Sequence, residues 1–220
     1  MGEWGSYGLS DFLLFSPQTY FRQFARLNEA TFPLPLLLIA LALAAALLAG
    51  SRRIWLRRAA VLASALLWAS SAWLFHHRSY ADINWAADRF ALGFAVQAAV
   101  LVLVAFAGPM PSRHPSPVAQ ALAIAVAVLY PLQALAFGRA WQEAEIVGFS
   151  PDATALFTLF VAAAIGGGAR WMLLPLALLW CAIGLLTLWT MGAPEFWSLA
   201  ALALAAMAAI GTTGRGQRQG

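Results

Sequence analysis

The sequence predicts an all-α membrane protein: a transmembrane bundle of about seven spans, with an amphipathic helix lying at the interface near its N-terminus. Hydrophobic residues make up 62% of the 220 residues and charged residues only 10%, whereas soluble domains contain about 25% charged residues. Long apolar runs alternate with short polar joints along the whole chain. A membrane, not water, is therefore the expected surrounding of most side chains.

The chain divides into three predicted segments. Residues 1–31 should form a tail on the outer face, 32–211 the helix bundle and 212–220 a cytoplasmic tail. The first residues contain an acid and no basic cluster, so a removable signal peptide is not expected.

The outer tail contains a predicted amphipathic helix that starts at Ser16-Pro17. Its apolar side repeats at helical spacing and its polar side carries charge, as a helix lying at a membrane interface requires. The apolar side holds Tyr20, Phe24 and Leu27, and the polar side holds Gln18, Arg22, Arg26 and Glu29. We expect either an interfacial anchor or a lid over an outward-facing cavity.

Seven stretches are predicted to cross the membrane, since a crossing helix needs about 20 residues at 1.5 Å each. They are Phe32–Ala49, Ala59–Phe75, Phe90–Ala107, Val118–Phe137, Pro151–Ile165, Trp171–Met191 and Pro194–Ile210. The fifth is short and could extend through Gly166 to Gly168. Ser150-Pro151 forms a capped helix start, and Pro131 and Pro175 should kink their spans.

The arginines predict the orientation. With the N-terminus outside, eight of the thirteen arginines fall on inner segments, whereas five arginines and all nine acids fall on outer segments. The positive-inside rule counts the basic residues, and the inner run SRRIWLRR at residues 51–58 contributes most. We therefore predict a multi-pass protein of the cell inner membrane, N-out and C-in, whose first partner is the lipid bilayer.

Residues 73–90, WLFHHRSYADINWAADRF, concentrate polarity in the predicted outer connection after the second span. His76 and His77 are adjacent and so point about 100° apart on a helix, which prevents both from binding one ion. Asp82 could supplement one of them, but the ligands are too few to predict a metal site. We expect the two histidines to be hydrogen-bonded or solvated at the end of the span.

Two further outer residues have predicted helix-capping roles. Asn84 precedes the third span where a cap belongs, and Asp152 lies in the first turn of the fifth span, where an acid favours the helix dipole. Arg78, Arg89 and Arg139 should form surface pairs with nearby acids, which contribute little stability.

The spans carry uncharged polar groups, and none of the charged residues needs to lie in mid-span. These polar groups are Gln97, Gln120, Gln133, Tyr130, Thr158 and Thr187. Such side chains usually bridge helices, and the absence of intramembrane charge weakens a channel or ion-coupled pump. A carrier for a neutral solute, with Gln97, Gln120, Tyr130 and Gln133 lining its path, remains an alternative.

Missing residue types exclude several kinds of chemistry. The chain has no lysine, which excludes a Schiff base and a Walker A loop, and its one cysteine, Cys181, excludes an internal disulfide. No pattern predicts a catalytic site, a bound metal, a cofactor or a nucleic-acid partner. Trp68 and Trp180 fall in mid-span and should pack between helices.

Three stretches together resemble a family of bacterial polytopic membrane proteins known only as a domain of unknown function. They are SDFLLFSPQTYFRQFARLNEATFP, FHHRSYADINWAADRF and GFSPDATALFTLF. The resemblance covers nearly the whole chain and pairs His76 with Asn84. Where relatives often have Cys-Pro, this chain has Asp152-Ala153, so the resemblance implies no thiol or soft-metal role here. It implies an architecture and no activity.

The function predicted from the sequence is that of a non-catalytic integral membrane protein, an accessory or assembly subunit or a small binding module. Its working surface would be the outer face, and a membrane-protein partner or a second copy of the chain could bind there. The candidate binding residues on this face are His76, His77, Asp82, Asn84, Asp152, Arg22, Arg26 and Glu29. A neutral-solute carrier is the first alternative. A membrane-embedded metal handler or hydrolase using His76, His77 and Asp82 is the second.

Overall fold

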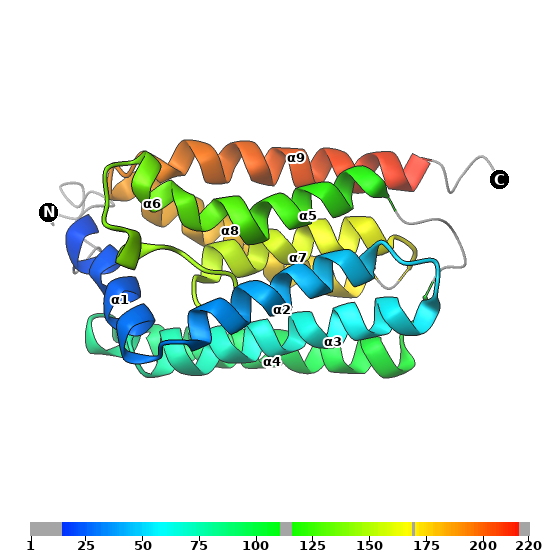
Figure 1. Ribbon diagram of the computed structural model, residues 1–220, viewed down its shortest axis with the longest axis horizontal. Helices are drawn as coiled ribbons and strands as arrows, with labels where there is room; N and C mark the ends of the chain where they lie inside the picture. The colour runs from blue at the N-terminus through cyan, green and yellow to red at the C-terminus, as the bar shows by residue number, and fades with distance from the viewer. Residues whose placement is uncertain (1–14, 111–115, 169, 216–220) are drawn as a thin grey trace, which may run out of the picture.

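The computed structural model describes residues 15–110, 116–168 and 170–215, and the regular elements within these ranges are helices. Seven of them lie side by side along the long axis of the molecule, and α1 (Pro17–Ala30) lies across one end (Figure 1). The seven are α2 (Leu34–Ala49), α3 (Ile54–Ser70), α4 (Ala87–Ala107), α5 (Pro117–Leu129), α7 (Pro151–Ile165), α8 (Arg170–Thr190) and α9 (Glu195–Arg215). A short helix, α6 (Gln133–Ala136), follows α5. The predicted all-α fold is confirmed.

Five helical segments are long and apolar enough to cross a membrane. They are Ile54–Asp82, Ala87–Ala107, Pro117–Ala136, Arg170–Thr190 and Glu195–Thr212. The pair formed by α1 and α2 would make a sixth, although it bends by 98°. The predicted number of seven crossings also needs α7, whose 15 residues span only about 22 Å at 1.5 Å each. The number of crossings and the orientation therefore remain predictions.

Helix α7 forms the centre of the bundle. All 15 of its residues are buried, and small side chains such as Ala153 and Ala155 let the neighbouring helices approach it closely. Ser150 caps its first turn, where its hydroxyl accepts the backbone N–H of Ala153 at 3.3 Å, as the sequence predicts. The helix ends at Ile165, because Gly166 adopts a positive φ of 68°. The extension of this helix through the following glycines is not formed.

Helix α1 packs against the bundle with the face that the sequence predicts. Tyr20, Phe24 and Leu27 are buried, while the polar side formed by Gln18, Arg22, Arg26 and Glu29 is exposed. Ser16 caps the helix by accepting the Thr19 N–H at 3.2 Å. The buried side-chain amide of Asn28 donates to the carbonyl oxygens of Gln142 and Ala144, at 2.7 and 2.9 Å. Hydrogen bonds as well as apolar contacts therefore hold α1 on the bundle.

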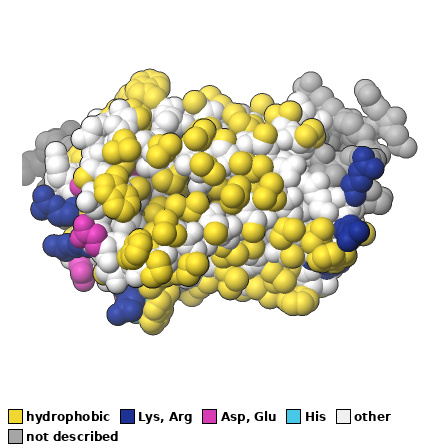
Figure 2. Space-filling model, viewed as in Figure 1, with side chains coloured by type: hydrophobic (Ala, Val, Ile, Leu, Met, Phe, Trp, Pro, Cys, Tyr) yellow, Lys and Arg dark blue, Asp and Glu magenta, His cyan; other side chains and the backbone are white. Residues whose placement is uncertain are grey.

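The two ends of the bundle differ in charge. We call the end covered by α1 and by the connections 78–86, 137–150 and 191–194 the α1 end, and the opposite end the arginine end (Figure 1). The described acids lie at the α1 end and are Glu29, Asp82, Asp88, Glu143, Glu145, Asp152 and Glu195. Figure 2 shows acidic and basic side chains at this end and only basic ones at the other, with a hydrophobic surface between them.

A π-helix over Ser71–His77 continues α3 to the α1 end. The Arg78 N–H donates to the Trp73 carbonyl at 3.1 Å, five residues earlier, as the wider turn requires. Ser71 is buried and donates its hydroxyl to the carbonyl of Phe149 at 3.0 Å. The wider turn also changes the directions of the residues within it, including the two adjacent histidines.

Candidate functional site

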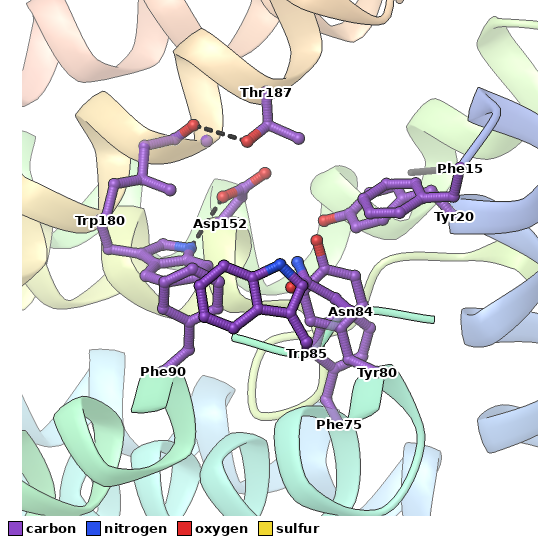
Figure 3. Close-up of a pocket in the computed structure, with 12 residues that line it drawn as sticks. Phe15, Tyr20, Phe75, Tyr80, Asn84, Trp85, Phe90, Asp152, Trp180 and Thr187 are labelled. Carbon is purple, nitrogen blue, oxygen red and sulfur yellow. Dashed lines mark hydrogen bonds between the residues drawn. The ribbon is translucent and has the colours of Figure 1, made fainter. Parts of the chain in front are cut away.

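A cavity of about 110 Å³ opens at the α1 end, between the π-helical end of α3 and helices α1, α4, α7 and α8 (Figure 3). Aromatic side chains form most of its wall, and a few polar groups face it. Its lining residues are Phe15, Tyr20, Phe75, Tyr80, Asn84, Trp85, Phe90, Asp152, Trp180, Ile183, Gly184 and Thr187. A concave apolar site with few polar groups is the usual form of a small-molecule site.

Asp152 is the one charged side chain in this lining. It is only 2% exposed, and its Oδ1 accepts a hydrogen bond from the indole Nε1–H of Trp180 at 2.9 Å. Among the described residues, no hydrogen bond reaches its second carboxylate oxygen, Oδ2. Figure 3 shows the carboxylate beside the indole of Trp180, with its second oxygen directed toward Thr187. Asp152, which the sequence predicts as an acid in the first turn of the fifth span, is thus buried and faces a cavity.

The backbone of α8 makes room for this carboxylate at Gly184. A Cβ atom added there would lie 2.2 Å from Oδ1 of Asp152, which is closer than two nonbonded atoms can approach. Because Trp180 and Gly184 are four residues apart on one helix, both face α7. Helix α8 therefore supplies the hydrogen-bond donor and the empty space that the acid needs.

The aromatic wall is a connected set of rings. Phe75 and Tyr80 stack with their centroids 5.3 Å apart, and Tyr20 meets the edge of Tyr80 at 5.9 Å. On the other side, Phe90 meets Trp180 edge to face at 5.2 Å. Such contacts hold rings in fixed orientations, so the cavity is shaped before anything enters it.

His76 lies behind this wall and does not line the cavity. Its ring is fully buried, 4.6 Å from the ring of Phe94 and 5.0 Å from that of Trp180. Neither ring nitrogen has a hydrogen-bond partner among the described residues. The prediction that both histidines would be hydrogen-bonded or solvated is therefore wrong for His76. It holds for His77, whose Nδ1 lies 2.8 Å from Oδ1 of exposed Asp88.

A second group of charges lies beside the cavity. Arg139 donates from Nε to Glu195 at 2.8 Å and from Nη2 to Glu145 at 3.0 Å. Its guanidinium lies over the ring of Phe21, 3.7 Å from the centroid. Both glutamate side chains are only 2% exposed, so the expected surface pair of Arg139 is instead a buried network. This network ties α1 and the 137–150 connection to the start of α9.

The buried charges at this end do not balance. Arg139 is shared by Glu145 and Glu195, and no basic residue lines the cavity around Asp152. Burial raises the pKa of Glu145, and the nearby Arg139 opposes this shift. Two of the three buried carboxyl groups thus share Arg139, the third, Asp152, has no ion pair among the described residues, and an additional positive charge would stabilise this region.

The other sequence-predicted residues lie apart from the cavity or at its edge. Asn84 lines it, and its Oδ1 accepts the Ala86 N–H at 2.9 Å, just before α4 begins. The exposed face of α1 carries Arg22, Arg26 and Glu29. Asp82 is also exposed. Within the described residues, no three His, Cys, Asp or Glu side chains are grouped to hold a metal ion.

The polar residues of the spans lie between different pairs of helices. Gln97 of α4 donates to the Leu173 carbonyl of α8 at 3.0 Å. Gln120 of α5 donates to the carbonyls of Ala46 and Leu47 at the end of α2, at 3.2 and 3.0 Å. Gln133 accepts the hydroxyl of Ser198. With Tyr130, it borders a separate hollow of about 210 Å³. The four residues proposed for a solute path are not brought together.

Sequence reasoning missed several residues of the site. Trp180 was expected only to pack between helices, and Tyr80, Gly184 and Phe75 carried no signal of their own. Trp68 does pack as predicted, and its Nε1–H donates to Thr158 at 2.8 Å. Trp180 and Gly184 are four residues apart and therefore lie on one face of their helix. The sequence does not show that this face is turned toward Asp152.

The fold and the cavity define a class: an all-helical protein with several helices that could cross a membrane and an aromatic cavity around a buried acid at one end. The chain belongs to a family of unknown function, DUF6064, which matches residues 17–219. No curated protein and no solved structure matches it. The predicted membership of an uncharacterised family is thereby confirmed, and the family assigns no activity.

Proposed function

We propose that this chain is a multi-pass protein of the bacterial inner membrane, N-out and C-in, that binds a small molecule at its outer face. The cavity around Asp152 is the binding site. The buried acid facing this cavity is the observation that carries the proposal, because a buried carboxyl oxygen without a partner is costly and a bound ligand can supply that partner.

The membrane placement rests on composition and charge. Five helical segments are apolar and long enough to cross, and the arginine end carries no described acid. An excess of arginine near span ends marks the cytoplasmic side. The α1 end, which carries the cavity, then faces outward, and α1 acts as part of the lid that the amphipathic pattern suggested.

The cavity favours binding over catalysis. Asp152 is fixed by Trp180, and the described lining holds no histidine, cysteine or second carboxyl group to act as an acid, base or nucleophile with it. His76 is separated from the cavity by the ring of Trp180. An accessory subunit that senses a small molecule and passes the signal to a membrane partner is one setting for such a module.

A stability screen tests this function without assuming a ligand. Purified full-length protein and its Asp152→Asn variant are heated with each member of a diverse library of small metabolites. We expect at least one compound to raise the unfolding temperature of the wild type and not that of the variant. If every compound affects the two proteins equally, the cavity is not a ligand site and the proposal is wrong.

A further inference from the structure

We propose that the cavity at the α1 end binds a small organic ammonium ion, whose charge lies beside Asp152 and whose alkyl groups contact the surrounding aromatic rings. This inference rests on the proposed binding function and specifies its ligand. The three observations that carry it are the unused acceptor of Asp152, the composition of the wall and the shortage of positive charge.

The carboxylate of Asp152 is placed so that it can accept a cation. Trp180 occupies Oδ1 through its hydrogen bond, which fixes the plane of the carboxylate. Oδ2 has no donor among the described residues. Helix α8 lies against the carboxyl group of Asp152 at Gly184, which has no side chain to cover it. A cation in the cavity can therefore reach Oδ2 directly.

The wall supplies the second element of ammonium recognition. Seven of the twelve lining residues are aromatic, and they come from segments on several sides of the cavity (Figure 3). The faces of aromatic rings attract cations, and cages of such rings are the usual site for alkylated ammonium groups. A metal ion would instead favour several converging carboxylate ligands, and Asp152 is the one carboxyl group in this lining.

Charge discriminates among the alternatives. An anionic ligand would lie against Asp152 with no arginine or histidine in the lining to hold it. A neutral ligand that cannot donate to Oδ2 would leave this buried oxygen without a partner. Arg139, the basic residue of the buried ion-pair network at this end, already pairs with Glu145 and Glu195. A cationic ligand would offset the excess of buried acidic groups at this end of the bundle.

Size and position limit the ligand further. The volume of about 110 Å³ lies well below the roughly 300–1,000 Å³ of drug-sized sites. The ligand is therefore a group such as choline, ethanolamine or a methylated amine. Because the cavity lies at an end of the bundle, the same ammonium group could come from a free solute or from the headgroup of a lipid.

The decisive comparison uses choline and its uncharged analogue, 3,3-dimethylbutan-1-ol, which replaces the nitrogen by carbon. Binding to purified full-length protein is measured by calorimetry, with potassium chloride as an ionic control. We expect choline to bind, and Asp152→Asn to weaken it about tenfold to a hundredfold, because a charged hydrogen-bonded contact is lost. Equal binding of the uncharged analogue, or equal binding of potassium, would overturn the inference.

A second variant keeps the test valid should Asp152→Asn fail to fold. Trp85 lines the cavity and is 73% exposed, so Trp85→Ala should not disturb the core. Its loss removes one aromatic face and should weaken choline binding about threefold to tenfold. Trp197, which is 70% exposed and does not line the cavity, is the matched control. Equal effects of Trp85→Ala and Trp197→Ala would contradict the proposal.

The source of the ammonium is tested with lipids. Protein is reconstituted into nanodiscs of phosphatidylethanolamine or of phosphatidylglycerol, and its unfolding temperature is measured with and without free choline. Stabilisation by choline in phosphatidylglycerol indicates a free solute, and stabilisation by phosphatidylethanolamine alone indicates a headgroup; either result supports the inference. If neither occurs while the metabolite screen yields a neutral or anionic ligand, this inference fails and the proposed function stands.

Discussion

Nε1 of Trp180 donates a 2.9 Å hydrogen bond to Oδ1 of Asp152, joining α8 to the first turn of the central helix α7. This contact orients the one charged group that faces the cavity. It satisfies one of the two carboxyl oxygens of an acid that is only 2% exposed among aromatic rings. The first prediction concerns this pair.

Trp180→Phe and Asp152→Ala should be strongly non-additive. Each single substitution removes the same hydrogen bond, so the double variant should lose less stability than the two losses together. A hydrogen bond to a charged group contributes about 1.5–3 kcal/mol, and the coupling energy should lie in that range. Thermal unfolding in detergent gives the four free energies of the cycle. Strict additivity would show that the bond does not stabilise the fold.

Gly184→Ala should destabilise the protein, because its Cβ would lie 2.2 Å from Oδ1 of Asp152. Overpacking of this kind costs about 1–3 kcal/mol. Gly93 of α4 is the matched control, since a Cβ there meets nothing within 4 Å. Gly93→Ala should be neutral or stabilising by up to about 1 kcal/mol, because alanine is the better helix former. Comparable losses in the two variants would mean that space at Gly184 is not the reason for its glycine.

Arg139→Gln should be among the most damaging single substitutions. It would leave Glu145 and Glu195 buried without a partner charge, at a cost of about 3–5 kcal/mol. Arg26→Gln, on the exposed face of α1, is the control and should change little. Chemical unfolding of both variants gives the comparison, and equal stability of the two would contradict the buried network.

The loss in Arg139→Gln should also depend on pH. Burial raises the pKa of Glu145, and removing Arg139 takes away the interaction that lowers it. A carboxyl group whose folded pKa exceeds its unfolded value makes the folded state less stable as pH rises between the two. The variant should therefore lie closest to the wild type near pH 4 and fall furthest below it above neutrality. A constant difference between pH 4 and pH 8 would exclude this mechanism.

The adjacent histidines should behave differently. His76→Phe keeps a ring in the aromatic cluster and removes two buried nitrogens that have no hydrogen-bond partner in the described part of the chain, so stability should be unchanged or higher. His77→Ala breaks only an exposed pair with Asp88 and should change stability by less than about 1 kcal/mol. Unfolding temperatures of the two variants test this. A large loss in His76→Phe would show that the imidazole makes a polar contact essential to the fold.

The sequence predicted the fold well where local chemistry decides it. Helix starts at Ser16-Pro17 and Ser150-Pro151 agree with the structure, because a capping hydroxyl followed by proline is a strong local signal. The buried side of α1 was predicted from its periodicity, and the division of charge between the two ends was visible from the arginine positions.

Burial of individual polar groups could not be predicted in the same way. Asp152 and Arg139 look like residues of exposed connections, and only the packing of α8, α9 and α1 over them decides that they are buried. The direction of His76 depends on the π-helix over Ser71–His77, whose wider turn has no reliable sequence signature. The site therefore had to be read from the tertiary structure.

The most direct measurement of the central claim is the labelling of Thr187→Cys, in a Cys181→Ala background, by a membrane-impermeant maleimide on intact cells. Thr187 lines the cavity, and among the described residues its hydroxyl bonds only the Ile183 carbonyl of its own helix, at 2.9 Å. Ser51→Cys at the arginine end is the control. We predict that Thr187→Cys is labelled from outside, more slowly when choline is added, and that Ser51→Cys is labelled only after the cells are opened. Labelling of Ser51→Cys alone in intact cells would contradict the account.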